Sequence, residues 1–512
     1  MREKIGFYAL VGMLGLLTAF QLQAVWPFVV DDAWIPLRYA KHLVAGLGIV
    51  WNHGESPLEG FSSFSFMLLG AGALWLGQNP LLWLKVAGTL GLLATLAGVF
   101  TLTRFWFQRI PSLIPVFWLL LYRGEMLWAV GGLETAVYQA LLVWATVFAF
   151  RAAGFNAFAK ARDAINPAAF MVCALMLAAG GMTRPETPAF MLLFGLWFLS
   201  DKSLVSTSEG RRGILMFTLT LTLVWGSWFL WRWQYFNGFF PNPVYCKGIS
   251  ESHYVLAHRY LRLIGIWLLP TLPILFKSFD RRFILLLAPG VFYLMALLHA
   301  EDIVAFDNRL FLPAFALFLP LPLLGLEAFT RRFLSQRAPN AVLLAVGILT
   351  GVLWIPSLTP AEYRHYIQNP LQHEQLRIKT LQWIRAHSTP QTRIVMGDSG
   401  QIPAEIDAVF IDSFCLNNRV MARMPLKVRA ETFCKDILAT NPDMVIVTEL
   451  IMNGKTLTLA VDRCLAGRLS QTKAWKEVRV FKTLMSHNSS YQYRIYQRMP
   501  VKPDRAETVK MR

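Results

Sequence analysis

Long segments without charge are the feature that most limits how this chain can fold. Residues 6–30 and 282–299 are apolar runs that carry almost no ionisable side chains. A helix needs about 20 apolar residues to cross a bilayer, and inside lipid it satisfies all of its own backbone hydrogen bonds. The sequence therefore predicts a protein that crosses a membrane several times.

Composition agrees with lipid as the main solvent. Of the 512 residues, 55% are hydrophobic and only 16% are charged, and the mean hydropathy is +0.43. A soluble domain carries about a quarter charged residues. The net charge of +18 could suggest nucleic acid, but the basic residues recur in short clusters between apolar runs. Such clusters orient membrane helices, so we expect membrane lipid around this chain and no nucleic acid partner.

We predict about eleven transmembrane helices within a module that spans residues 1–357. The first run follows Arg2 and Lys4 and lacks a small-residue cleavage site, so it is interpreted as a retained span. The runs expected to cross lie at 6–30, 84–103, 111–130, 135–150, 168–182, 187–200, 214–232, 259–276, 282–299, 310–328 and 340–357. The shorter run 61–77 is predicted to be re-entrant or interfacial.

The distribution of basic residues predicts the orientation. Arginine and lysine gather in alternate links between the apolar runs, and such links face the cytoplasm. The N-terminus is then inside, and the remaining links, which hold most of the acidic residues, are outside. The interpretation requires that 61–77 does not cross, because otherwise the alternation fails.

From residue 358 the pattern changes to that of a soluble α/β domain, predicted over 358–512 on the outer side of the membrane. Residues 369–387 form an amphipathic helical pattern. Four short segments are typical of strands, at 393–397, 444–448, 478–482 and 493–497. Cys415 and Cys434 could pair in an oxidising compartment, and free thiols are an equally good interpretation.

The first outer loop, 31–60, holds the candidate catalytic residues. Asp31 and Asp32 are adjacent carboxylates at the outer end of the first span, and Arg38 and Glu59 follow in the same loop. Acidic residues beside hydrocarbon are costly and are tolerated where they face a wet cavity or bind something. The alternative is that the pair merely ends the helix among solvated headgroups.

Further candidate substrate-binding residues lie in other outer links. Each has a plain structural alternative, as a turn residue or as a cation that reaches the interface. All of them fall on one predicted side of the membrane, which favours a shared site. They are Glu134, Arg184, Glu186, Tyr245, Lys247, Asp302 and Arg309.

This arrangement suits glycosyl transfer from a lipid-linked donor. Outside the cytoplasm no nucleotide-activated sugar is supplied, so a transferase there would use a sugar on a lipid phosphate. The reaction needs a carboxylate to accept the proton of the acceptor hydroxyl and cations to stabilise the departing phosphate. Asp31 or Asp32 suits the first role, and Arg184, Lys247 and Arg309 suit the second. One base with direct displacement would invert the anomeric carbon.

The first loop also resembles a known family. The stretch DDAWIPLRYAKHLVAGLGIVWNHGESPLEGFSSF (31–64) resembles the first outer loop of bacterial GT-C glycosyltransferases, in particular the group like the terminal arabinofuranosyltransferase of mycobacteria. Later segments resemble that family in the same order, so the resemblance covers nearly the whole chain. They are GGLETAVY (131–138), TRPE (183–186), YFNGFFPNPVYCK (235–247), DNRLFLPAFAL (307–317), GDSGQIP (397–403) and IDSFCLNN (411–418).

The resemblance implies a GT-C membrane module with its active site under the first outer loop and an outward C-terminal domain. It implies the bacterial cytoplasmic (inner) membrane, with that domain in the periplasm. Asp31 and Asp32 match the family's acidic pair and Glu59 its EG motif. Family members differ in metal use, so the acidic pair is also a candidate for a divalent cation. The segments 242–247 and 300–313 depart from the family pattern, which leaves the sugar open.

Together these observations predict a polytopic glycosyltransferase that moves a sugar from a polyprenyl-phosphate donor to a cell-envelope glycan, lipid or protein. The first alternative is a transporter or flippase of lipid-linked sugars, although the sequence lacks the paired broken helices common in transporters. A second is a noncatalytic assembly or chaperone protein. A third is a protein O-mannosyltransferase or a lipid A-modifying enzyme, which only acceptor chemistry would distinguish.

Overall fold

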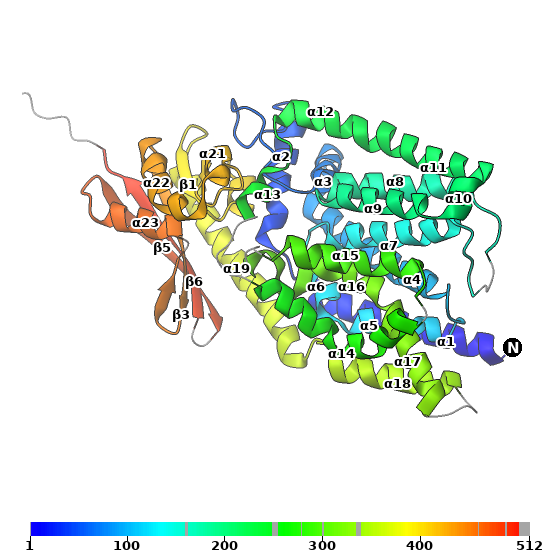
Figure 1. The fold of residues 1–512 in the computed structure, drawn as a ribbon. Coiled ribbons are helices and arrows are strands. Elements are labelled where there is room, and N and C mark those ends of the chain that lie inside the picture. Colours follow the sequence, from blue (N-terminus) through cyan, green and yellow to red (C-terminus); the bar gives the residue numbers. More distant parts are fainter. Residues whose placement is uncertain are drawn as a thin grey trace, which may run out of the picture. The chain divides into compact units, whose positions relative to one another are not determined.

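The structure is a computed structural model that describes residues 2–158, 162–247, 254–277, 279–298, 302–333, 339–458, 460–486 and 489–500 (Figure 1). The chain divides into two compact units. Unit 1 comprises residues 1–49 and 59–371, and unit 2 comprises residues 50–58 and 372–512. The second unit thus begins later than residue 358, and it includes nine residues of the first loop.

Unit 1 is built of helices. From the N-terminus to the middle of the chain these are α1 (Arg2–Val25), η1 (Asp31–Ala33), α2 (Trp34–Val44), α3 (Phe64–Trp75), α4 (Pro80–Thr103), η2 (Pro111–Leu113), α5 (Ile114–Leu121), α6 (Arg123–Val130), α7 (Thr135–Ala152), α8 (Pro167–Thr183) and α9 (Thr187–Leu199). They continue as α10 (Lys202–Ser206), α11 (Ser208–Thr220), η3 (Leu221–Gly226), α12 (Ser227–Phe236), α13 (Asn242–Lys247), α14 (Val255–Lys277), α15 (Arg282–Ala296), η4 (Asp302–Phe311), α16 (Leu312–Phe318), α17 (Pro320–Phe333), α18 (Pro339–Trp354) and the start of α19 (Pro360–His387).

Several of these helices can span a membrane. Within the described residues, five helices are long and apolar enough to cross, or up to seven if each of two bent helix pairs is one span. The bent pairs are 111–121 with 123–130, and 307–318 with 320–333. The other predicted spans correspond to apolar helices of 10–17 residues, so a count of eleven crossings stays a prediction. The run 61–77 forms α3, a helix of only 12 residues.

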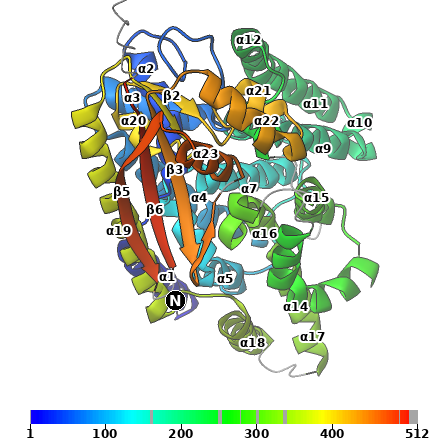
Figure 2. The same ribbon diagram turned by 90° about the vertical axis from the view of Figure 1, so that its left-hand side faces the viewer.

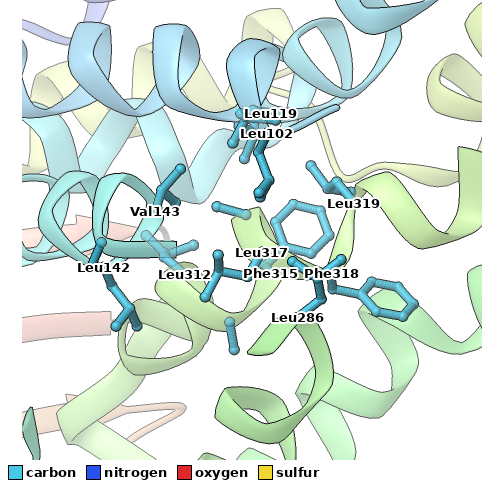
Figure 3. Close-up of a cluster of buried hydrophobic side chains, with 14 of the residues drawn as sticks. Leu102, Leu119, Leu142, Val143, Leu286, Leu312, Phe315, Leu317, Phe318 and Leu319 are labelled. Carbon is cyan, nitrogen blue, oxygen red and sulfur yellow. The ribbon is translucent and has the colours of Figure 1, made fainter. Parts of the chain in front are cut away.

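The core of unit 1 surrounds α16, which is buried on every side (Figure 3). Each of its seven residues is apolar, and a helix that is apolar all round belongs in an interior. Figure 3 shows Leu312, Phe315 and Phe318 among side chains of α4, α5, α7 and α15. Since η4 leads directly into α16, this packing fixes the position of Arg309 near the end of η4.

Helices α11, η3 and α12 run end to end beside α8 and α9 (Figure 1). The middle segment η3 is a π-helix, a feature often found at functional sites. The combined helix, Ser208–Phe236, is one of the five candidate spans, and little of it is buried inside the protein. Lipid is therefore the expected surrounding of its exposed faces.

Unit 2 contains a sheet with strand order β2-β1-β3-β6-β5, and β4 pairs with β3 (Figure 2). Strands β2, β1 and β3 are parallel, whereas β6 is antiparallel to both β3 and β5. The strands are β1 (Arg393–Met396), β2 (Val409–Asp412), β3 (Met444–Met452), β4 (Lys455–Leu457), β5 (Trp475–Ser486) and β6 (Ser489–Arg498). The four predicted strands correspond to β1, β3, β5 and β6.

The helices of unit 2 are the end of α19, α20 (Gln401–Glu405), α21 (Arg419–Arg423), α22 (Leu426–Ala439) and α23 (Ala460–Ser470). Helices α22 and α23 pack together, and α23 lies against β3 and β5. A disulfide joins Cys434 of α22 to Cys464 of α23. Neither interpretation of Cys434, a pairing with Cys415 or a free thiol, is correct, because Cys434 is bonded to Cys464.

Candidate active site

The acidic pair lies on η1, directly after the first span. Val30 is extended, and its N–H donates to the carbonyl of Gly131 at 3.2 Å. Gly132 has φ +82°, and a Cβ there would lie 2.9 Å from the Cβ of Ala33. Glycine is therefore required at position 132 both by the backbone angle and by this close approach. The contact holds Asp31 and Asp32 against the turn that leads to Glu134.

Asp32 forms an ion pair with Lys247. The Lys247 Nζ lies 3.3 Å from Oδ2 of Asp32, and the Asp32 side chain is 48% exposed. The ammonium of Lys247 lowers the pKa of the Asp32 carboxyl below its ordinary value, and the guanidinium of Arg309 adds to this effect. Asp32 is thus ionised at neutral pH, under the influence of two cations from distant parts of the chain.

A largely buried ion cluster is formed by residues of three other links. Glu134 Oε1 accepts from Arg184 Nη1 at 2.8 Å and from Arg309 Nη2 at 3.0 Å. Arg184 Nε also donates to Glu186 Oε1 at 2.9 Å, and the Tyr293 hydroxyl donates to the same oxygen at 3.1 Å. We call Glu134, Arg184, Glu186 and Arg309 the ion cluster. Its two cations balance its two anions, as buried charges require.

Arg309 is held rigidly. Its Nε donates to Thr135 Oγ1 at 3.0 Å, and its guanidinium lies 4.9 Å from the centre of the Trp128 ring. The two preceding residues, Asp307 and Asn308, have φ values of +45° and +54°, in the left-handed region that such residues tolerate. Arg123 Nε pairs with the Asp307 carboxylate at 2.8 Å and stabilises this turn.

Glu59 forms a second buried pair, with Arg232 of α12. Both side chains are 3% exposed. Burial raises the pKa of Glu59 to about 7, even though Arg232 acts in the opposite direction. Arg232 was not predicted as a site residue. The available signal was a lone charge inside an apolar run, which in a membrane helix indicates function by default.

A cavity of about 410 Å³ borders Glu59, Arg232 and Glu186. Apart from Ser62, its other walls are apolar and about half of them are aromatic, which suits a hydrocarbon chain. The other lining residues are Ser62, Phe64, Gly181, Met182, Pro185, Pro188, Ala189, Trp225, Trp228, Phe229, Phe239, Phe240, Pro241 and Phe292. Because Glu186 also belongs to the ion cluster, the apolar cavity and the charged cluster meet at this residue.

The remaining predicted residues lie around this centre. Asp31 and Asp32 do not line the cavity, and Asp32 is linked to it through Arg309 and the ion cluster. Arg38 is buried on α2. Tyr245, on α13 with Lys247, accepts the N–H of Phe240 at 3.4 Å. Asp302 begins η4, and its side chain lies outside the described residues.

The described residues do not supply a complete set of protein ligands for a metal ion. No group of three or more His, Cys, Asp or Glu side chains that could hold a metal ion occurs among them. Of the two candidate ligands, Asp32 is already paired with Lys247. We therefore assign no step of the chemistry to a bound cation.

The arrangement of the helices and the sheet is that of a known fold. Proteins of similar structure are GT-C glycosyltransferases, which are integral membrane proteins, and this chain has their fold.

Three solved structures illustrate the similarity. ArnT from Cupriavidus metallidurans bound to undecaprenyl phosphate is 13% identical, with a TM-score of 0.56, over 94% of this chain and 98% of that chain. The oligosaccharyltransferase AglB from Archaeoglobus fulgidus, in complex with an inhibitory peptide and a dolichol-phosphate, is 11% identical, with a TM-score of 0.52, over 88% and 74%. The arabinofuranosyltransferase AftD from Mycobacteria is 14% identical, with a TM-score of 0.51, over 95% and 41%.

Sequence comparisons identify one matching family, which covers only the C-terminal part of the chain. Residues 362–496, mostly in unit 2, match the family described as "Domain of unknown function (DUF8728)". No curated protein matches the chain. At 11–14% identity, the similarity to the three structures establishes the fold and leaves the substrates to be argued from the site.

Proposed function

We propose that this chain transfers a sugar from a polyprenyl-phosphate donor to a glycan, lipid or protein of the cell envelope. The observation that carries the proposal is that the apolar cavity and the ion cluster share Glu186. A lipid-linked sugar phosphate has the same two parts, a hydrocarbon tail and a charged head. Two of the similar structures are bound to undecaprenyl phosphate and to a dolichol-phosphate, which supports a donor of this kind.

The proposed chemistry is a single displacement. A carboxylate of the pair Asp31 and Asp32 takes the proton of the acceptor hydroxyl as its oxygen bonds to the anomeric carbon. The bond from that carbon to the phosphate oxygen breaks, and the electron pair leaves with the lipid phosphate. Lys247, which pairs with Asp32, and Arg309, whose charge also acts on Asp32, stabilise the phosphate charge. One base and direct attack invert the anomeric centre.

We also propose that the site faces the periplasm of a bacterium, at the outer surface of the cytoplasmic membrane. The alternation of basic links supports an inside N-terminus. The disulfide between Cys434 and Cys464 supports an oxidising compartment for unit 2. Together they support a first loop and a C-terminal unit on the same, outer side.

The test uses the purified full chain in nanodiscs with a panel of polyprenyl-phosphate sugars and envelope acceptors. Transfer is expected with at least one donor, and Asp31→Asn or Asp32→Asn should abolish it while the protein stays folded. Absence of transfer with every donor, or full activity of both variants, would overturn the proposal. Movement of the lipid-linked sugar across a liposome membrane without transfer would favour a transporter instead.

A further inference from the structure

Nine residues of the first loop, 50–58, belong to unit 2 although the residues on both sides of them belong to unit 1. The chain leaves unit 1 after Ile49 and returns to it at Glu59. We call residues 50–58 the strap. The catalytic loop is therefore covalently continuous with a segment that folds as part of the C-terminal unit.

Within unit 2 the strap is bonded to the edge strand β2. Asn52 Oδ1 accepts the N–H of Phe410 at 2.9 Å, and Asn52 Nδ2 donates to the carbonyl of Phe410 at 2.9 Å. The side-chain amide thus replaces the backbone partner that an edge strand lacks on its outer side. Trp51 Nε1 donates to the same carbonyl at 2.9 Å, and Arg419 Nη2 donates to the carbonyl of Pro57 at 3.1 Å.

Within unit 1, the two residues that flank the strap, Ile49 and Glu59, are anchored to one face of α12. The N–H of Ile49 donates to the Tyr235 hydroxyl at 3.0 Å, and the Glu59 carboxylate pairs with Arg232. Residues 232 and 235 are three apart, so they share a helix face. Gly48 has φ +85°, a conformation that favours glycine, and a Cβ there would lie 3.1 Å from the Tyr235 hydroxyl.

The residues that follow the strap, Glu59 and Gly60, form two further hydrogen bonds. The carbonyl of Glu59 accepts the N–H of Asn242 at 2.9 Å, and the N–H of Gly60 donates to the Tyr39 hydroxyl at 3.2 Å. Since Glu59 and Arg232 border the apolar cavity, any movement of the strap reaches the cavity wall within one residue.

We propose that the C-terminal unit positions the wall of the donor cavity through the strap. Asn52 and Trp51 are the positioning residues, because they bond the strap to that unit. This inference rests on the proposed function only for the identity of the ligand in the cavity. The edge strand fixes the strap, the strap fixes Glu59, and Glu59 fixes Arg232 in the wall. Neither Asn52 nor Trp51 touches the cavity, so both act through Glu59.

The decisive variant is Asn52→Asp in the full chain. Aspartate has nearly the same shape, but it loses the donor to the Phe410 carbonyl and sets a charge beside that oxygen. The matched control is His53→Ala, because His53 is exposed in the same strap. Trp51→Phe is a second variant that removes the Nε1 donor and part of the buried ring, and it covers the case in which Asn52→Asp fails to fold.

Amide hydrogen exchange gives the readout that needs no activity. We expect exchange at Phe410 to rise about tenfold or more in Asn52→Asp, and exchange at 46–49 and 59–63 to rise with it. Trp51→Phe should raise exchange at the same two ends by less, and His53→Ala should leave it unchanged. Faster exchange at Phe410 with unchanged exchange at both ends would overturn the proposal.

Kinetics give the second readout once a donor is known. Because the strap positions the cavity wall and not the reacting atoms, the KM for the lipid donor should rise several-fold in Asn52→Asp with kcat within about twofold. A fall in kcat alone would contradict this role. If the wild-type chain transfers no sugar, the proposed function fails while the exchange result still decides whether the units are coupled.

Discussion

Arg184 and Arg309 donate to the same carboxylate oxygen of Glu134, at 2.8 and 3.0 Å. One anion thus holds together two guanidinium groups that come from links 125 residues apart in the chain (309 − 184). Without that anion the two cations would repel each other in a buried place. Glu134 is therefore the residue on which the geometry of the ion cluster depends.

Glu134→Gln should lower the stability of unit 1 and abolish transfer. Removal of one partner of a buried ion pair leaves an uncompensated charge and costs about 3–5 kcal/mol. Thermal unfolding in detergent measures the change. The matched control is Glu327→Gln, whose partner Arg331 is 62% exposed and whose loss should cost less than about 0.5 kcal/mol. Equal effects of the two variants would show that Glu134 has no special role.

Lys247→Met should move the acid limb of the pH profile of transfer activity to higher pH. Lys247 lowers the pKa of Asp32, so its removal returns that pKa upward and Asp32 protonates at a higher pH. The same pairing stabilises the fold above the ordinary pKa of Asp32, and this contribution is lost as pH falls through the lowered value. Lys247→Arg keeps the charge and should keep the limb in place. An unmoved limb in Lys247→Met would exclude Asp32 as the titrating group.

Much of the site could be predicted as separate residues, but its assembly could not. Glu134, Arg184, Glu186 and Arg309 follow from charges at the ends of apolar runs. Their convergence depends on helix packing around α16, which no local pattern reports. Tyr293 was missed because an aromatic residue in an apolar run gives no polar signal.

In unit 2, strands β1, β3, β5 and β6 follow from alternation and β-branched content, whereas the short strands β2 and β4 were missed. The strap was assigned to the membrane module because it lies between apolar segments of that module in the sequence. Its long-range hydrogen bonds to Phe410 cannot be predicted from composition or local pattern. Five cysteines permit several pairings, so the bond between Cys434 and Cys464 required coordinates.

Ala189→Trp should raise the KM for a long polyprenyl donor and leave that for a short-chain donor nearly unchanged. Ala189 lines the cavity of about 410 Å³, and an indole there occupies the space proposed for the lipid tail. The matched control is Ala97→Trp, which fills a separate groove of about 340 Å³ between α1, α4 and α5. Steady-state kinetics with donors of two chain lengths measure the effect. A similar change for both donors would argue against a tail in this cavity.

Asp462→Asn should make the stability of unit 2 less dependent on pH. The carboxylate of Asp462 is buried, accepts the N–H of Thr448 and the hydroxyl of Ser413, and lies near Asp412 and Glu449. Burial raises its pKa to about 7. The folded state therefore holds this proton more tightly than the unfolded chain does. The wild-type unit consequently loses stability as pH rises from about 4 to about 7. Each unit of pKa difference corresponds to about 1.4 kcal/mol, so the total loss is a few kcal/mol. The neutral amide removes that loss. Amide exchange of β3, corrected for the intrinsic rate at each pH, should show the wild type more stable at pH 5 than at pH 8 and the variant nearly equal at both. Equal pH dependence in the two proteins would mean that another group causes the loss.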